Sequence, residues 1–261
     1  MSDLLKRYDL FGWDYPLHSH LTECEVSWYL KFARETGGPV LDMPCGTARL
    51  LSRLAQVGFD VTGIDLSDTM LRLAGENIAR LSPEARARAR LVKADMSDFR
   101  LNRKFGLIYV ADNSFRELTT REGELACLRC VRKHLKKHGI FLMAERRFDP
   151  AIYPQGRREF GWSQPYRNPA TGESVRRRGA IDLSPDGRWI CGKFIYEVTR
   201  PDGATHVEEC PIEGPILHTE DYLALLAEAG LAASAYADYT DSPADGSEKM
   251  TCFVCKKRGQ T

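Results

Sequence analysis

Three acidic residues each close an apolar, strand-like segment of the chain, namely Asp42, Asp65 and Asp95. The stretch VLDMPCGTARL, residues 40–50, passes from an apolar run through a tight turn at Gly46 into helical spacing. In an open α/β sheet, ligands bind outside the carboxyl ends of the strands. The three acids are therefore expected to meet at one edge of a sheet and to line a binding site there.

The residues of this turn indicate which ligand the site takes. A dinucleotide needs closely spaced glycines so that backbone can approach a pyrophosphate, but here Pro44 precedes Gly46, the pattern GxGxxG is not met and a P-loop lysine is missing. We therefore expect a nucleoside without phosphates that is neutral or positively charged near Asp42. Asp65 lies nineteen residues after Gly46, where an acid commonly accepts from ribose hydroxyls. S-adenosylmethionine (SAM), with its ribose diol, ammonium and sulfonium, meets these demands.

Apolar runs and helical spacing alternate along the first 145 residues. The run FGLIYVA, residues 105–111, is typical of a central parallel strand. Thr119 and Glu122 have capping-box spacing for a helix, which Gly139 is expected to end. The order predicts an α/β protein with a doubly wound, Rossmann-like seven-stranded sheet. The expected strands are 39–43, 59–65, 90–95, 105–111 and 140–145, and the helices before residue 82 are 21–36, 47–57 and 68–81.

From residue 149 to about residue 214 helical periodicity is missing, and the turns SPDG and PDG separate strand-like runs. We expect a small antiparallel sheet inserted into the α/β domain, with strands at 174–183, 188–199 and 205–212. Thr219 is expected to cap a helix over TEDYLALLAEAG, and two strands, 231–239 and 250–257, close the chain. The expected domains are an N-terminal lid or helical segment at 1–37, a SAM-binding α/β domain at 38–148 and 215–261, and the inserted sheet at 149–214.

Composition bounds the class of protein. The chain has 261 residues, a formal net charge of +1 and 43% hydrophobic residues, so nothing favours nucleic acid or an acidic membrane as a partner. Its first residues have no apolar signal segment, so we expect a cytoplasmic protein. The basic run EARARAR, residues 84–90, is interpreted as a solvated connection.

Eight cysteines include two CxxC pairs, Cys127/Cys130 and Cys252/Cys255, which zinc could use. The first pair lies in a helical pattern and the second in a strand pattern, without the turn residues of a metal knuckle. Buried free thiols are therefore favoured, and no metal site is expected.

The chain resembles the class I SAM-dependent methyltransferases of the small-molecule type. Residues 40–50 resemble the first motif of this family, VTGIDLSDTML the second, KADMSDF the third and FGLIYVADNSF the fourth. The closing TEDYLALLAEAG…CFVCKK resembles the last helix and the antiparallel final strands. The resemblance covers about residues 38–145 and 216–257. Pro44 and Ala48 depart from it, because they replace the usual first and third glycines.

The resemblance implies a role for each matching residue. Asp42 and Gly46 would hold the methionine part of SAM, Asp65 the ribose, and Asp95 the adenine amino group. Each acid has a simpler interpretation as a cap of the next helix. The full set of residues expected to bind the cofactor is Tyr15, Asp42, Pro44, Gly46, Thr47, Asp65, Leu66, Met70, Asp95, Met96, Asp112 and Asn113.

The expected function is transfer of a methyl group from SAM to an N or O atom of a small-molecule acceptor. The alternative is a catalytically silent protein that binds SAM or its product and uses the inserted sheet for an interaction. Candidates for the acceptor side and for catalysis are Tyr15, His20, Arg116 and Glu145. Arginine clusters in the insert could bind an acidic substrate, but solvated strand faces are the favoured interpretation. A homodimer through the insert is possible.

Overall fold

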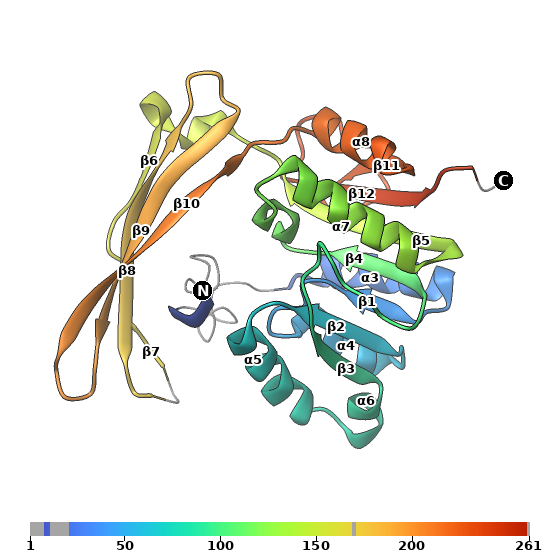
Figure 1. Ribbon diagram of the computed structural model, residues 1–261, viewed down its shortest axis with the longest axis horizontal. Coiled ribbons are helices and arrows are strands. Elements are labelled where there is room, and N and C mark those ends of the chain that lie inside the picture. The colour runs from blue at the N-terminus through green and yellow to red at the C-terminus, as the bar shows by residue number, and fades with distance from the viewer. Residues whose placement is uncertain (1–7, 11–20, 169–170, 260–261) are drawn as a thin grey trace. The chain divides into compact units, whose positions relative to one another are not determined.

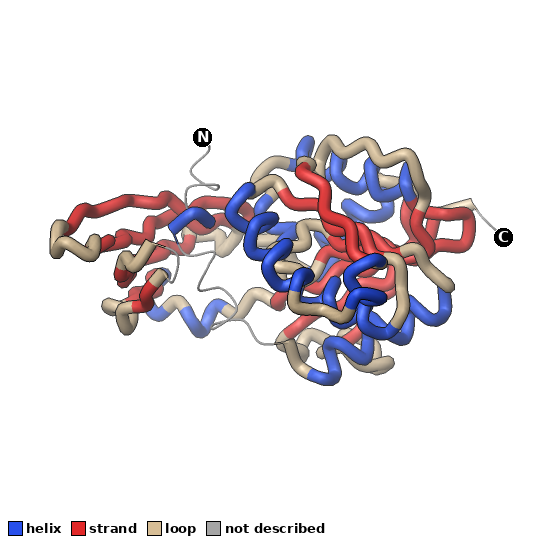
Figure 2. Tube along the Cα trace, turned by 90° about the horizontal axis from the view of Figure 1, so that it is seen from below, coloured by secondary structure: helices blue, strands red, loops and turns tan. Residues whose placement is uncertain are grey.

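The computed structural model describes residues 8–10, 21–168 and 171–259 of the chain (Figures 1 and 2). Within these residues, no helix has the length and apolar character needed to cross a membrane. The chain divides into two compact units. The first comprises Met1–Ser19 and Phe148–Ile216, and the second His20–Arg147 and Leu217–Thr261.

The second unit is built on a seven-stranded sheet with the order β11-β12-β5-β4-β1-β2-β3. The first five strands of the chain run parallel, and β12 is antiparallel to both β5 and β11. This arrangement confirms the predicted Rossmann-like fold with a separate antiparallel sheet. The strands are β1 (Val40–Asp42), β2 (Val61–Asp65), β3 (Ala89–Lys93), β4 (Phe105–Val110), β5 (Leu135–Arg146), β11 (Leu231–Ala237) and β12 (Met250–Lys257).

Helices cover both faces of this sheet because alternate strand residues are apolar on each side. Side chains of α3 (Glu23–Thr36), α4 (Arg49–Val57) and α5 (Asp68–Ala79) share one buried cluster with β1 and β2. Side chains of α7 (Arg121–His134) and α8 (Thr219–Glu228) share the other with β4 and β5. The second unit also contains two short helices, α6 (Pro83–Ala87) and the 3₁₀ turn η2 (Ser114–Glu117).

Four local predictions are wrong. The run interpreted as a connection contains α6, where Ser82 caps a proline-initiated helix. Thr120, not Thr119, caps α7 through its side chain, and α8 is capped by His218, not Thr219. Gly139 lies inside β5 and does not end a helix, because α7 ends at His134 and β5 starts at once to pair with β4.

All eight cysteines are free thiols. Cys127 and Cys130 lie on α7, as their helical spacing predicts. On β12, Cys252 and Cys255 face opposite sides of the sheet, and each joins a different apolar cluster.

The first unit is an antiparallel sheet with the strand order β10-β9-β8-β6, and β7 pairs with β8. Val175, Tyr196, Val198 and Cys210 form its small buried cluster, against which Leu10 packs. Two 3₁₀ turns, η3 (Pro150–Ile152) and η4 (Pro154–Gly156), precede the sheet. Its strands are β6 (Arg157–Phe160), β7 (Tyr166–Arg167), β8 (Ser174–Leu183), β9 (Trp189–Thr199) and β10 (Thr205–Pro215).

Candidate active site

Asp42 ends β1 at the carboxyl edge of the central sheet and is only 3% exposed. Burial raises the pKa of its carboxyl to about 8, and the neighbouring carboxylate of Asp65 adds to the rise. The side chain of Tyr109 on β4 and the positive charge of Arg49 oppose it. A buried carboxyl of this kind gains most from a cation placed beside it, such as an ammonium.

Asp65 ends β2 and is bonded to the backbone on both sides of the site. One of its oxygens accepts the Gly46 N–H at 2.9 Å, and the other accepts the Ser67 N–H at 2.9 Å. Burial raises the pKa of this carboxyl, and the two N–H groups lower it. Each carboxylate oxygen can accept a second hydrogen bond, so ribose hydroxyls could bind without breaking these contacts.

The loop between β1 and α4 has room beside its backbone. Gly46 adopts a φ of +50°, and an added Cβ there would find no atom of the described residues within 4 Å. The hydroxyl of Thr47 is buried without a hydrogen-bond partner in the part of the chain that the structure describes, while the carbonyl of Thr47 accepts the Asn77 side chain at 2.9 Å. The open space, the orphaned hydroxyl and the buried acid Asp42 fit a cationic nucleoside at this loop. Pro44, half-buried, occupies the same turn.

The residues predicted to surround adenine differ in exposure. Met70 is buried in the first turn of α5, whereas Leu66 is 37% exposed just before it. Asp95 lies exposed beyond the end of β3 and accepts the N–H and hydroxyl of Ser97, each at 2.7 Å. Met96 beside it packs against the apolar cluster of α7.

The turn after β4 holds two consecutive residues in the left-handed region, Asp112 at φ 56° and Asn113 at φ 61°. Such backbone is costly for residues other than glycine and persists where surrounding contacts fix it. Asp112 pairs with Arg49 at 3.2 Å. The Asn113 N–H donates to the carbonyl of Ala144 at 3.2 Å, and its side-chain oxygen accepts the N–H of Arg146. The Asn113 side chain therefore ties β4 to β5.

Arg116 and Glu145, both predicted as candidates for the acceptor side, form an ion pair in which Glu145 is buried and Arg116 is half-buried. The Nε of Arg116 lies 3.0 Å from a Glu145 oxygen, and the guanidinium also donates to the carbonyl of Arg146. The Tyr222 hydroxyl donates to the same Glu145 oxygen at 3.4 Å. Burial raises the pKa of Glu145 to about 7, and Arg116 opposes the rise.

Sequence reasoning missed Glu25 on α3, which the structure buries on the same face of the sheet as Tyr29 and Tyr109. Its carboxyl accepts the Tyr239 hydroxyl at 3.4 Å, and burial followed by the charge of Asp112 raises its pKa. The sequence did contain a signal for this residue, because Glu25 lies on the same helical face of α3 as the apolar residues Tyr29 and Ala33. Tyr15 and His20 lie outside the described residues.

Comparison with known proteins finds similarity mainly in the first half of the chain. Residues 40–139 match the family described as methyltransferase domain. The chain is 29% identical over 140 residues to dTDP-3-amino-3,4,6-trideoxy-alpha-D-glucopyranose N,N-dimethyltransferase of Streptomyces venezuelae, covering 52% of this chain and 54% of that protein. It is 29% identical over 144 residues to glycine/sarcosine N-methyltransferase of Aphanothece halophytica, covering 52% of each. The chain spans about half the length of the curated relatives it matches.

Solved structures share the fold along most of the chain. A SAM-dependent methyltransferase from Clostridium acetobutylicum superposes with a TM-score of 0.73 at 19% identity, covering 99% of this chain and 100% of that one. DesVI of Streptomyces venezuelae superposes with a TM-score of 0.64 at 23% identity, covering 98% and 99%. At these identities the likeness shows the fold alone, and the family match at residues 40–139 identifies the domain.

Proposed function

We propose that this chain, a member of the class I SAM-dependent methyltransferases, transfers a methyl group from SAM to a nitrogen or oxygen atom of a small molecule. One observation carries the proposal. Asp42 and Asp65, both less than 8% exposed, flank a loop whose Gly46 leaves open space, at the edge where this fold binds ligands. These residues suit a ligand that brings positive charge and a ribose but no phosphate.

Each residue of this edge would have a separate task. Asp42 would ionise opposite the ammonium, and Asp65 would accept the ribose hydroxyls while keeping the Gly46 loop in place. When bound, SAM would supply a methyl group carried on a positively charged sulfur. The acceptor would attack the methyl carbon from the side opposite that sulfur. The protein's part is then mainly alignment, since holding two reactants in line removes much of the entropic barrier. The turn at Asp112 and Asn113, held by Arg49 of α4 and by the backbone of β5, would provide a rigid wall for that alignment.

The acceptor is proposed to be a small molecule. The curated relatives include enzymes named for glycine or sarcosine and for an aminosugar nucleotide, and both are N-methyltransferases by name. We therefore place small amines and aminosugars first in an acceptor screen, with phenolic hydroxyls second. A cytoplasmic location, a possible homodimer and the predicted roles of Tyr15 and His20 stay predictions from the sequence.

The first experiment is calorimetric titration of the full chain with SAM. Wild type is expected to bind in the micromolar range, and Asp65→Ala to bind about tenfold or more weakly, since a hydrogen bond to a charged group contributes roughly 1.5–3 kcal/mol. Asp182→Ala is the matched control, because Asp182 is an aspartate of the other unit that pairs with Arg157. Thermal melts of both variants exclude simple unfolding. Absence of binding by a folded wild type would overturn the proposal.

A second measurement separates an enzyme from a catalytically silent binder. Protein that has bound SAM is incubated with a metabolite extract, and formation of S-adenosylhomocysteine is followed by mass spectrometry. Release that depends on both protein and extract supports transfer. Binding without any release across amine, aminosugar and phenol pools supports the silent alternative.

A further inference from the structure

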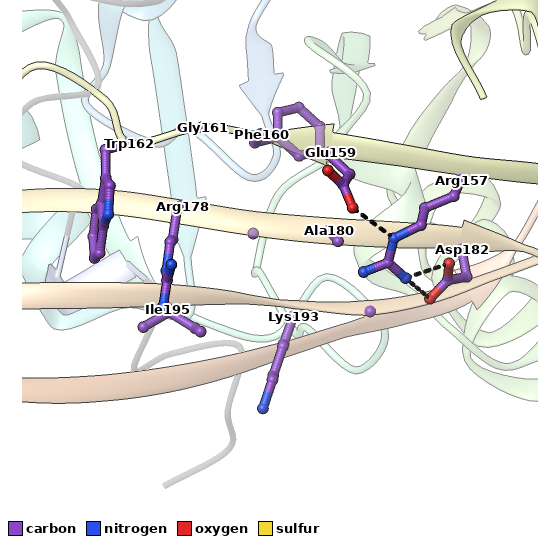
Figure 3. A pocket seen from close by; sticks show the side chains of 12 residues that line it. Arg157, Glu159, Phe160, Gly161, Trp162, Arg178, Ala180, Asp182, Lys193 and Ile195 are labelled. Atoms are coloured by element: carbon purple, nitrogen blue, oxygen red, sulfur yellow. Dashed lines mark hydrogen bonds and ion pairs between the residues drawn. The ribbon is translucent and has the colours of Figure 1, made fainter. Parts of the chain in front are cut away.

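One face of the antiparallel sheet in the first unit carries an open groove of about 650 Å³ (Figure 3). This volume is within the range typical of small-molecule sites. Ala180 is the smallest side chain on this face, where it lies between Arg178 and Asp182 on β8 and opposite Lys193 on β9. The groove therefore lies over the face of β8 and β9 that carries Arg178, Ala180, Lys193 and Ile195.

Trp162 and Arg178 form one end of the groove (Figure 3). The guanidinium of Arg178 lies 4.9 Å from the centre of the Trp162 ring, and that of Arg176 lies 4.5 Å from it. Stacking on an aromatic ring orients a guanidinium while leaving its N–H edge available. Ile195, the partner of Arg178 on β9, adds an apolar side chain beside it.

The cations of this face differ in how their charge is balanced. Arg157 pairs with Asp182 at 2.7 Å and with Glu159 at 3.0 Å. Lys193 pairs with Glu209 at 2.8 Å. Among the described residues, Arg178 has no carboxylate within ion-pairing distance. Glu197 pairs with Arg176 at 2.7 Å and also interacts with the charge of Arg178, so one carboxylate faces two guanidiniums. A guanidinium held in place with positive charge in excess is suited to an anion, because its planar donors match carboxylate and phosphate oxygens.

We propose that this groove binds a small molecule that carries a carboxylate or phosphate on a planar apolar ring, with the anion on Arg178 and the ring against Ile195 and Ala180. The proposal is carried by the juxtaposition of two features: a guanidinium that is oriented by Trp162 and has no ion pair of its own among the described residues, and the small apolar side chains of Ala180 and Ile195. It uses residues of the first unit alone, and it does not depend on methyl transfer.

The test titrates the full chain, without SAM, with phenyl phosphate, inorganic phosphate and phenol by calorimetry. Phenyl phosphate is expected to saturate one site. Arg178→Gln should weaken its binding about tenfold, the usual order for a charge-assisted hydrogen bond. Trp162→Leu should weaken it several-fold, because Arg178 loses the ring that orients it. Inorganic phosphate should bind more weakly than phenyl phosphate, and phenol should not bind.

Two matched variants test whether a loss of binding is specific to the groove. Trp189 is 40% exposed, as Trp162 is, but does not line the groove, and Arg200 is an exposed arginine outside it. Trp189→Leu and Arg200→Gln should both bind phenyl phosphate as wild type does. The proposal is overturned if wild type shows no saturable binding, if Arg178→Gln binds unchanged, or if the matched variants lose affinity equally. Equal affinity for inorganic phosphate and phenyl phosphate would contradict the role of the ring.

Discussion

The carboxyl edge of the seven-stranded sheet and the open face of the five-stranded sheet both gather charged residues, yet they hold them in opposite ways. At the edge, Asp42 and Glu145 are 3% and 1% exposed, and burial raises the pKa of each to about 8 and about 7. On the face, the side chains of Arg157 and Asp182 are 48% and 46% exposed and neutralise each other.

This difference suggests two roles for charged residues: the buried carboxyls of the edge suit ligand binding, and the exposed ion pairs of the face suit a solvated surface. A buried carboxyl without full compensation costs stability, so the presence of Asp42, Asp65 and Glu145 at this edge indicates a role beyond folding. Exposed ion pairs cost and contribute little. By this criterion the groove is mostly an ordinary strand surface, and Arg178 is the residue that departs from it.

The largest expected effect is on the pair at the edge. Arg116→Ala leaves Glu145 buried without its cation, which should lower the free energy of unfolding by about 3 kcal/mol at pH 8. The cost should shrink at pH 5, because a carboxyl with a raised pKa is then protonated in the fold. Urea denaturation at the two pH values measures both.

Arg157→Ala is the matched control for this change, because it removes a cation from an exposed pair. It should leave the denaturation midpoint close to that of wild type at both pH values. Equal destabilisation by the two alanine variants would contradict the distinction between the edge and the face.

The second effect is a pH dependence that only the edge should show. Because the pKa of Asp42 is about 8, SAM should bind about tenfold more tightly at pH 8.5 than at pH 6.5, as the carboxylate that faces the cation forms. Without SAM the pH dependence has the opposite sign: the free energy of unfolding should fall as the pH rises from about 4 toward 8, since the unfolded chain releases this proton first.

The Asp42→Asn variant should bind SAM more weakly than wild type, and its affinity should change little with pH. Titration calorimetry at four pH values tests this, and an unchanged slope in Asp42→Asn would assign the proton elsewhere.

Much of the fold follows from local pattern. Strands of a parallel sheet buried on both faces are continuously apolar, so FGLIYVA predicted β4 to within one residue. Alternation and turn residues likewise placed β8 at Ser174–Leu183. Predicted helix and strand boundaries were wrong where pairing with a distant strand, or the shortness of an element, determines the secondary structure. Gly139 has the character of a helix terminator, but pairing with β4 draws the residues before it into β5. The five residues of α6 are too few to show a period.

The candidate site was predictable only in part for the same reason. An acid that ends a strand is visible in the sequence, so Asp42 and Asp65 could be placed at the ends of β1 and β2. The partners of these acids are not visible, because they come from distant parts of the chain. The N–H of Gly46 on Asp65 and the tie from Asn113 to Arg146 depend on how strands adjoin. Glu145 was singled out, but its ion pair with Arg116, 29 residues earlier, needed the structure.

The third effect compares two glycines with the same backbone demand. Gly46 at the edge and Gly187 in the hairpin turn of the first unit have φ values of +50° and +69°, and neither would crowd a Cβ. Alanine at either position should cost about 1 kcal/mol of stability from left-handed strain. SAM affinity should fall in Gly46→Ala alone, because its methyl group enters the space left for the ligand. Similar SAM affinity in the two variants would show that this space is not used.

The smallest expected effect is on stability at the groove. Arg178→Gln should leave the melting temperature within about 1 °C of wild type, because no carboxylate pairs with the residue and its stem is exposed. Arg176→Gln should lower it more, since Arg176 pairs with Glu197 at 2.7 Å and holds the pKa of that carboxyl below its usual range. Both arginines stack on Trp162, so the comparison isolates the ion pair from the stacking. A large loss of stability in Arg178→Gln would mean that this arginine holds the sheet together, and its charge would then not be free for an anion.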